Sequence, residues 1–205
     1  MDKKKEKKDK KIIWIILILL LIIALSIGFA LFTSQLNIQS TATVSSDPSA
    51  FKVVFSTSDN SSVGGTPILG GVATGGTVGK DTTTITDLSA SFTAPGQTAV
   101  WKFYSYNSGK YDAFLNKVTL GAIVCTPDGA DASRVAEAAK SLSIKISVGG
   151  QVYTSTNEKI DSHTLAKTSG EEIIVTLSYA EGAPAVDGNF NVSIGDIILE
   201  YNSAD

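Results

Sequence analysis

The chain has 205 residues and a formal net charge of −3, with 17 Lys and Arg against 20 Asp and Glu. The charge is unevenly divided, because residues 1–11 carry seven Lys and three acids whereas the remainder is acidic. An acidic body argues against a nucleic-acid-binding protein, since such proteins cluster Lys and Arg. With 43% hydrophobic and 18% charged residues, the chain also has too apolar a composition for a disordered protein.

Residues 12–32 are uncharged and almost entirely apolar, and they directly follow the basic segment. A helix of this length roughly matches a hydrocarbon core of about 30 Å. Lysines before such a span stay in the cytoplasm, so the rest of the chain is expected outside it. Two fates remain open. The stretch is a retained signal anchor, or it is a signal peptide cleaved after Ala30, since Gly28-Phe29-Ala30 offers a small-x-small site.

The chain therefore divides into three parts. Residues 1–11 form a basic cytoplasmic segment, residues 12–32 a transmembrane anchor or cleavable signal, and residues 33–205 one extracytoplasmic domain. The expected location is the cell membrane as a single-pass protein, or the exterior if the leader is removed. The third part is long enough for one good core and short for two.

Strand-prone stretches follow one another through the third part, separated by Gly, Pro and Asn turns. They cover residues 36–44, 51–55, 85–92, 100–106, 113–125, 142–148, 151–154, 171–179 and 190–201. Residues 113–125 are expected to form a strand pair or one bulged strand, and the turn Gly149-Gly150 predicts a hairpin. Residues 59–81 contain three Gly pairs and little periodicity, so a long mobile loop is expected there, with at most a weak edge strand at Ile68 and Leu69.

One short helix is expected after Asp131, which can cap it, because Val135, Ala138 and Leu142 recur at helical spacing. About nine strands with one short helix predict an all-β fold, an antiparallel β-sandwich of jelly-roll or immunoglobulin-like type.

The order of these segments resembles the TasA/camelysin group of exported prokaryotic surface proteins. The parts that carry the resemblance are the leader end at 29–34, the strand at 36–44, Pro95-Gly96-Gln97, the aromatic strand at 100–106, Asn107-Ser108-Gly109 and Ala113. The resemblance implies a jelly-roll domain of the cell surface, associated with fibres or biofilm matrix, in which a terminal strand of one subunit completes the sheet of the next.

This chain departs from the group in three ways. Its leader is longer and more hydrophobic, the Ser/Asp-rich segment after the leader is only partly matched, and residues 59–81 look peculiar to it. Camelysin is described as a protease, but no catalytic cluster can be carried over to these residues.

Residues 34–44 give an independent reason to expect assembly, because they are strand-prone and carry no charge. Edge strands normally carry charge, Pro or a bulge that discourages pairing with another chain. The segment could therefore donate a strand to a neighbour, or it could pair within its own sheet as the first strand. The donor residues would be Leu36, Ile38, Ala42 and Val44.

The aromatic strand offers a second interaction candidate. Alternation places Trp101 and Phe103 on one face, where they would pack in the core, and Tyr104 and Tyr106 on the other. Those two tyrosines could form a surface patch for a glycan or a protein.

Enzymatic functions find little support in the sequence, and no enzyme is expected. The chain has a single histidine, His163, which is expected in a loop or at a strand end, so neither a zinc cluster nor a serine triad is apparent. Cys125 is expected to be a buried thiol. No cofactor is expected except weakly calcium, for which turns supply oxygen atoms. The calcium candidates are Asp128, Asp131, Asp187 and Asn189.

Three function classes follow. The first is a structural or interaction protein of the cell surface, with the membrane, copies of itself or other surface proteins as partners and no nucleic acid. The second is a monomeric ligand-binding or accessory ectodomain. The third is an exported, metalloprotease-like hydrolase.

Overall fold

The computed structural model describes residues 33–38, 51–79, 84–155 and 158–203. Within these ranges it has sixteen strands and one helix, so the expected all-β class with antiparallel sheets and one short helix is confirmed. The strands are more numerous than the nine expected. The predicted stretches 85–92, 113–125 and 190–201 each give two strands, residues 59–81 give three, and a strand at Glu158–Leu165 was not expected.

The first layer is a sheet in the order β12-β11-β14-β8-β2, and β3 also pairs with β8. Its strands are β12 (Gln151–Tyr153), β11 (Leu142–Val148), β14 (Gly170–Tyr179), β8 (Thr98–Asn107), β2 (Val53–Ser56) and β3 (Ile68–Gly71).

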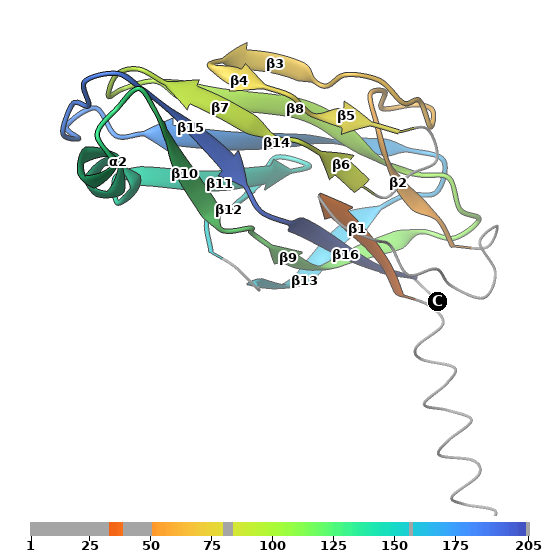
Figure 1. The fold of residues 1–205 in the computed structure, drawn as a ribbon. Helices are drawn as coiled ribbons and strands as arrows, with labels where there is room; N and C mark the ends of the chain where they lie inside the picture. The colour runs from red at the N-terminus through yellow and green to blue at the C-terminus, as the bar shows by residue number, and fades with distance from the viewer. Residues whose placement is uncertain (1–32, 39–50, 80–83, 156–157, 204–205) are drawn as a thin grey trace, which may run out of the picture.

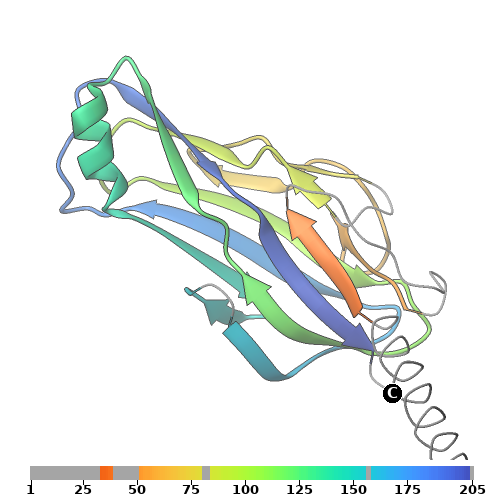
Figure 2. The same cartoon turned by 60° about the horizontal axis from the view of Figure 1, so that its bottom comes forward.

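The second layer consists of two sheets, in the orders β13-β9-β16-β1-β6-β5 and β10-β15-β7-β4. The strands of the first are β13 (Glu158–Leu165), β9 (Ala113–Thr119), β16 (Ile197–Ser203), β1 (Thr33–Ile38), β6 (Thr84–Thr86) and β5 (Thr77–Val78). The strands of the second are β10 (Ile123–Asp128), β15 (Asn189–Ile194), β7 (Ser89–Phe92) and β4 (Ala73–Thr74). The paths β9/β10, β15/β16 and β6/β7 each run on from one of these sheets into the other (Figure 2).

Strict alternation explains why β8 and β14 form the centre of the first layer. Trp101 and Phe103 are fully buried, whereas Lys102, Tyr104 and Tyr106 lie half-buried on the outer face. The prediction for the two faces of this strand is therefore confirmed. Inward residues of both layers form one continuous apolar core, which is what a two-layered, sandwich-like fold requires.

Glycines allow the second layer to bend where β9/β10 and β15/β16 are interrupted. A Cβ on Gly121 would lie 2.2 Å from the backbone carbonyl of Gly195, and the Gly195 N–H donates to the Ala122 carbonyl at 2.8 Å. The two backbones therefore touch at this crossing, which is why two long stretches of sequence become four strands.

The edge strand expected at Ile68 and Leu69 is present as β3, but the prediction of a loop over the rest of 59–81 is wrong, since this segment also contributes β4 and β5. Its glycines make sharp corners: Gly71 has φ +63, and a Cβ there would lie 1.8 Å from the Thr98 carbonyl oxygen. The segment is also tied to the core, because Trp101 Nε1 donates to the Thr74 carbonyl at 3.0 Å. Glycine-rich composition here reflects close backbone approach rather than freedom.

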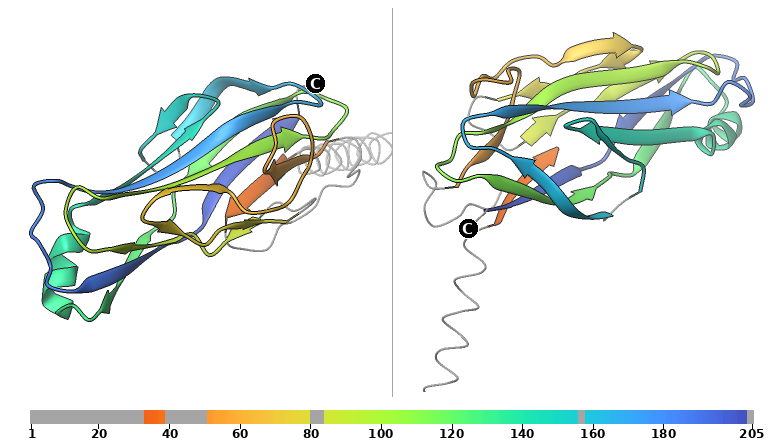
Figure 3. Two further views of the ribbon diagram at one scale, coloured as in Figure 1. Left: turned by 90° about the horizontal axis from the view of Figure 1, so that it is seen from above. Right: turned by 180° about the vertical axis from the view of Figure 1, so that it is seen from behind.

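Helix α2 (Ala132–Ala139) lies at one end of the molecule, and the start of β1 lies at the other (Figures 1 and 3). Asp131 caps α2 as expected, accepting from the backbone N–H groups of Ser133 and Arg134, while Val135 and Ala138 face the core. The Gly149-Gly150 turn joins β11 to β12 in the expected hairpin.

The glycine crossing predicts a large difference between two glycine-to-alanine variants. Gly121→Ala should lower the free energy of unfolding of the 33–205 domain by about 1–3 kcal/mol, because its methyl group meets fixed backbone. Gly182→Ala is the matched control, since no atom lies within 4 Å of its Cβ position, and it should stay within about 0.5 kcal/mol of the parent. Denaturant titration measures both. Equal stabilities for the two variants would contradict the crossing.

Candidate functional site

The N-terminal strand β1 lies in a slot between β16 and β6, and the strands that continue these two, β15 and β7, are direct neighbours elsewhere in the layer. Where β15 and β7 lie, they pair with each other from Phe190↔Phe92 to Ser193↔Ser89. Their continuations, β16 and β6, are separated, and β1 lies between them. The second layer is thus split along part of its length, and β1 fills the split (Figure 1).

Backbone pairing holds β1 on both edges. It runs antiparallel to β16 over six register pairs, from Thr33↔Asn202 to Ile38↔Ile197. It runs parallel to β6 over two pairs, Asn37↔Thr84 and Ile38↔Ile85. A strand between two others satisfies its neighbours' N–H and C=O groups, so removing β1 would leave two unpaired edges inside the layer.

The slot has a closed end and an open end. At the closed end the Ile194 N–H donates to the Leu88 carbonyl at 3.3 Å, just before the strands diverge. Ile38 is the β1 residue nearest this point, and Thr33 marks the open end. Asp87, with φ +63, lies at the break between β6 and β7 where the divergence begins.

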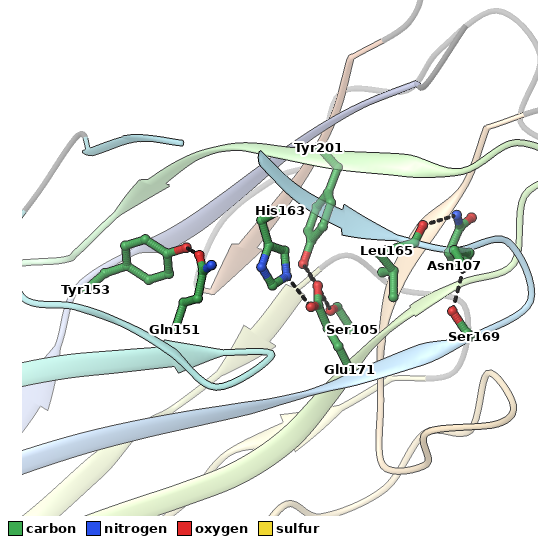
Figure 4. Close-up of polar contacts among 10 residues, drawn as sticks. Ser105, Asn107, Gln151, Tyr153, His163, Leu165, Ser169, Glu171 and Tyr201 are labelled. Atoms are coloured by element: carbon green, nitrogen blue, oxygen red, sulfur yellow. Dashed lines mark hydrogen bonds and ion pairs between the residues drawn. The ribbon is translucent and has the colours of Figure 1, made fainter. Parts of the chain in front are cut away.

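Behind β16, four polar side chains meet between the layers (Figure 4). Glu171 of β14 accepts a hydrogen bond at Oε1 from the Tyr201 hydroxyl of β16, at 2.7 Å, and another from the Ser105 hydroxyl of β8, at 3.1 Å. Its Oε2 contacts Nε2 of His163, which comes from β13. We call Ser105, His163, Glu171 and Tyr201 the interlayer cluster; it joins two strands of each layer.

The interlayer cluster is buried and closely covered. The side chains of His163 and Glu171 are 9% and 10% exposed. Gly149, with φ +55, lies against them, since a Cβ there would be 2.6 Å from both Glu171 Oε2 and His163 Cε1. Burial raises the pKa of the Tyr201 phenol well above its ordinary value, and the Glu171 carboxylate adds to this rise.

The cluster geometry fits a structural bond between layers better than catalysis. In a serine triad the histidine contacts the nucleophilic hydroxyl. Here Glu171 lies between His163 and Ser105, and it accepts from the serine. Each polar group has a partner, which is what burial of polar atoms requires.

Sequence reasoning did not predict this cluster. His163 was expected in a loop or at a strand end, whereas it lies within β13 and is buried. The alternation of β14 could have indicated the cluster, because Glu171 shares the buried face of Ile173 and Val175. A carboxylate on a core-facing position needs a polar partner.

The predicted interaction residues are only partly covered by the described ranges. Leu36 and Ile38 belong to β1, paired within the sheet of their own chain, whereas Ala42 and Val44 lie outside the described residues. Tyr104 and Tyr106 share the outer face of β8, and Lys102 beside them forms an ion pair with Glu172.

The calcium candidates all lie near α2. Asp128 and Asn189 are register partners at the ends of β10 and β15, and Asp187 precedes β15. Asp131 is already used as a cap, and its bonds from the Ser133 hydroxyl and the backbone N–H groups of Arg134 and Ser133 lower the pKa of its carboxyl. Over the described ranges, no group of three or more His, Cys, Asp or Glu side chains is placed to hold a metal ion.

Cys125 packs half-buried against the core, and burial raises the pKa of its thiol.

The predicted membrane span at 12–32 lies outside the described residues. Within the described part of the chain, no helix has the length and apolar character needed to cross a membrane.

Comparisons of the chain with protein-family models, curated proteins and solved structures each found no match.

The buried Tyr201 hydroxyl predicts a specific loss of stability at alkaline pH. Its pKa is higher in the folded chain than in the unfolded one, so the stability it contributes is present below about pH 10 and is lost above it. Between pH 10 and 11 the parent should lose about 1 kcal/mol more than Tyr201→Phe. At pH 7, Tyr201→Phe should cost about 1–2 kcal/mol, because Glu171 loses a donor.

Tyr111→Phe is the matched control, since this tyrosine is 52% exposed. It should follow the parent within about 0.5 kcal/mol at each pH. Denaturant titrations of the 33–205 domain at pH 7, 10 and 11 provide the comparison. Identical pH dependences for the parent and Tyr201→Phe would show that the phenol is not buried against the carboxylate.

Proposed function

We propose that this chain is an exported structural protein of the cell surface, delivered by residues 12–32, whose jelly-roll-type domain assembles by donating β1 to the slot of the next subunit. The observation that carries the proposal is the position of β1 between β16 and β6, held on both edges by backbone pairing. The resemblance of the segment order to that of fibre- and matrix-associated surface proteins also supports the proposal.

The slot suits exchange because a second copy offers the same strand. Backbone hydrogen bonds between strands depend on strand direction and register, and these are the same for β1 of any copy of the chain. The β1 strand of a neighbour would therefore make the same hydrogen bonds with β16 and β6. Each hydrogen bond within the chain is then replaced by an equivalent bond between chains. The balance between closed monomer and assembly therefore depends on concentration and on the connecting segment. That segment, residues 39–52, can reach about 45 Å when fully extended.

The sequence of the donor segment supports the same function. Residues 34–44 carry no charge, so the usual device against intermolecular pairing is missing from them. An empty slot would leave β16 and β6 with unpaired edges, which favours its constant occupation, either by the same chain or by a neighbour.

A pair of cysteines across the slot distinguishes the two occupants. Gln35 and Glu200 face each other in register on β1 and β16, and facing Cα atoms about 4.5–5.5 Å apart suit a disulfide. In a Cys125→Ala background, Gln35→Cys with Glu200→Cys should give covalent oligomers in the exported, oxidised protein. Denaturing gels without reductant would show a ladder, which reduction would collapse to the monomer.

The matched control places cysteines at Lys145 and Thr176, which face each other on β11 and β14 within the first layer. This pair should close only within one chain. A cysteine pair across the slot that also closes only within one chain would contradict strand donation and favour the monomeric accessory ectodomain.

Two further measurements address the remaining alternatives. Casein hydrolysis that a chelator abolishes would instead favour the hydrolase. N-terminal sequencing of the same material shows whether residues 1–30 remain.

A further inference from the structure

The open end of the slot lies where the domain meets the leader. Thr33 directly follows residue 32, the last residue of the apolar stretch, so no linker separates the expected span from β1. The register places Thr33, Asn202, Phe114 and Thr164 in one row across β1, β16, β9 and β13. With strands about 4.8 Å apart, Phe114 lies about 10 Å from Thr33 and Thr164 about 14 Å from it.

Two connections extend beyond this row on the side of residue 32. Residues 108–112 join β8 to β9, and residues 166–169 join β13 to β14. These two connections carry exposed aromatic and basic side chains, and the exposed Phe114 of β9 lies beside them. Tyr111 is 52% exposed, Phe114 is 41% exposed, and Lys110 and Lys167 are exposed. We call Lys110, Tyr111, Phe114 and Lys167 the rim.

Hydrogen bonds of Asn107 link the two connections that carry the rim. Its Nδ2 donates to the Tyr111 carbonyl at 2.9 Å and to the Leu165 carbonyl at 3.2 Å, while its Oδ1 accepts from the Gly109 N–H at 3.0 Å. Its backbone exchanges hydrogen bonds with Ser169 and Thr168. The Asp112 carboxylate accepts from the Lys167 backbone N–H at 2.8 Å, so this nearby acid also serves the loop structure.

Charge distinguishes the two ends of the domain. The end that carries α2 exposes more acids than bases. The acids there are Asp128, Asp131, Glu137, Glu181 and Asp187, against Arg134 and Lys140. At the rim end, Lys110 and Lys167 lie near Asp112 and the exposed Asp59. An anionic lipid surface would therefore repel the α2 end more strongly than the rim.

The geometry points to the rim as a membrane-contacting surface: in the anchored chain, Lys110, Tyr111, Phe114 and Lys167 lie in the lipid headgroups and hold the domain in one orientation. A span that ends at residue 32 leaves Thr33 in a headgroup region roughly 5–8 Å thick, and the row beside Thr33 is carried with it. Tyrosine prefers this interface, and lysine pairs there with lipid phosphates. The inference rests on the membrane attachment contained in the proposed function.

Fluorescence quenching in vesicles tests the orientation. The full chain, in a Cys125→Ala background, is reconstituted into phosphatidylcholine vesicles with a minority of phosphatidylglycerol. An environment-sensitive fluorophore is attached at Ser108→Cys, on the rim connection, or at Ala136→Cys, on the exposed side of α2. A headgroup spin label should quench the first probe several-fold more than the second. Equal quenching would overturn the inference.

A second comparison separates contact by the rim from orientation by the anchor alone. Lys110→Gln with Tyr111→Ser should reduce quenching of the Ser108→Cys probe. The matched control, Lys145→Gln with Val152→Ser, removes an exposed lysine and an exposed apolar side chain away from the rim and should leave quenching unchanged. Unchanged quenching in the rim variant would overturn the contact. Flotation with the vesicles reports the anchor separately, so a chain that fails to float contradicts the proposed membrane attachment instead.

Discussion

The structure depends on a requirement of the backbone: the split in the second layer must be filled by a strand. The paths β15/β16 and β6/β7 pair at one end and diverge past Ile194 and Leu88. Unpaired N–H and C=O groups at that divergence would be costly. β1 satisfies both edges, yet it joins the rest of the domain only through residues 39–52. Under the proposed function, a strand that both edges need and that a single segment connects to the rest of the domain is the part exchanged between subunits.

One wall of the slot, β16, is held by interactions that do not involve β1. Tyr201 attaches β16 to the first layer through Glu171 and Ser105, and His163 closes the other side of the same carboxylate. Asn107 fixes the connections at the open end. Losing one partner from such a buried network leaves another polar group unsatisfied, so the network resists partial opening. Under the proposed function, this network would hold β16 in place whichever chain supplies the strand in the slot.

Side-chain periodicity predicted the parts of this fold in which one face is buried. The alternation of β8 and β14, the hairpin at Gly149-Gly150 and the cap at Asp131 follow from local chemistry, and all three are present. The slot and the interlayer cluster depend instead on contacts between distant segments. Nothing local to Gly121 indicates that it meets Gly195, or that His163 meets a carboxylate in the facing layer. The glycines of residues 59–81 suggested a loop, but glycine is favoured both in flexible loops and where two backbones approach closely. The sequence alone does not distinguish these two cases.

The state of the N-terminus would determine what kind of assembly strand exchange can build. β1 enters the slot with Ile38 at the closed end and Thr33 at the open end. If residues 12–32 remain in the bilayer, Thr33 of every subunit stays at the membrane surface, and so does the open end of every slot. Donor and acceptor must then stand side by side on the membrane. A fibre that grows away from the surface needs Thr33 to leave the bilayer, which requires release of the leader. Under the proposed function, cleavage after Ala30 therefore decides which assembly forms: a lateral assembly on the membrane if the leader stays, or a free fibre if it is removed.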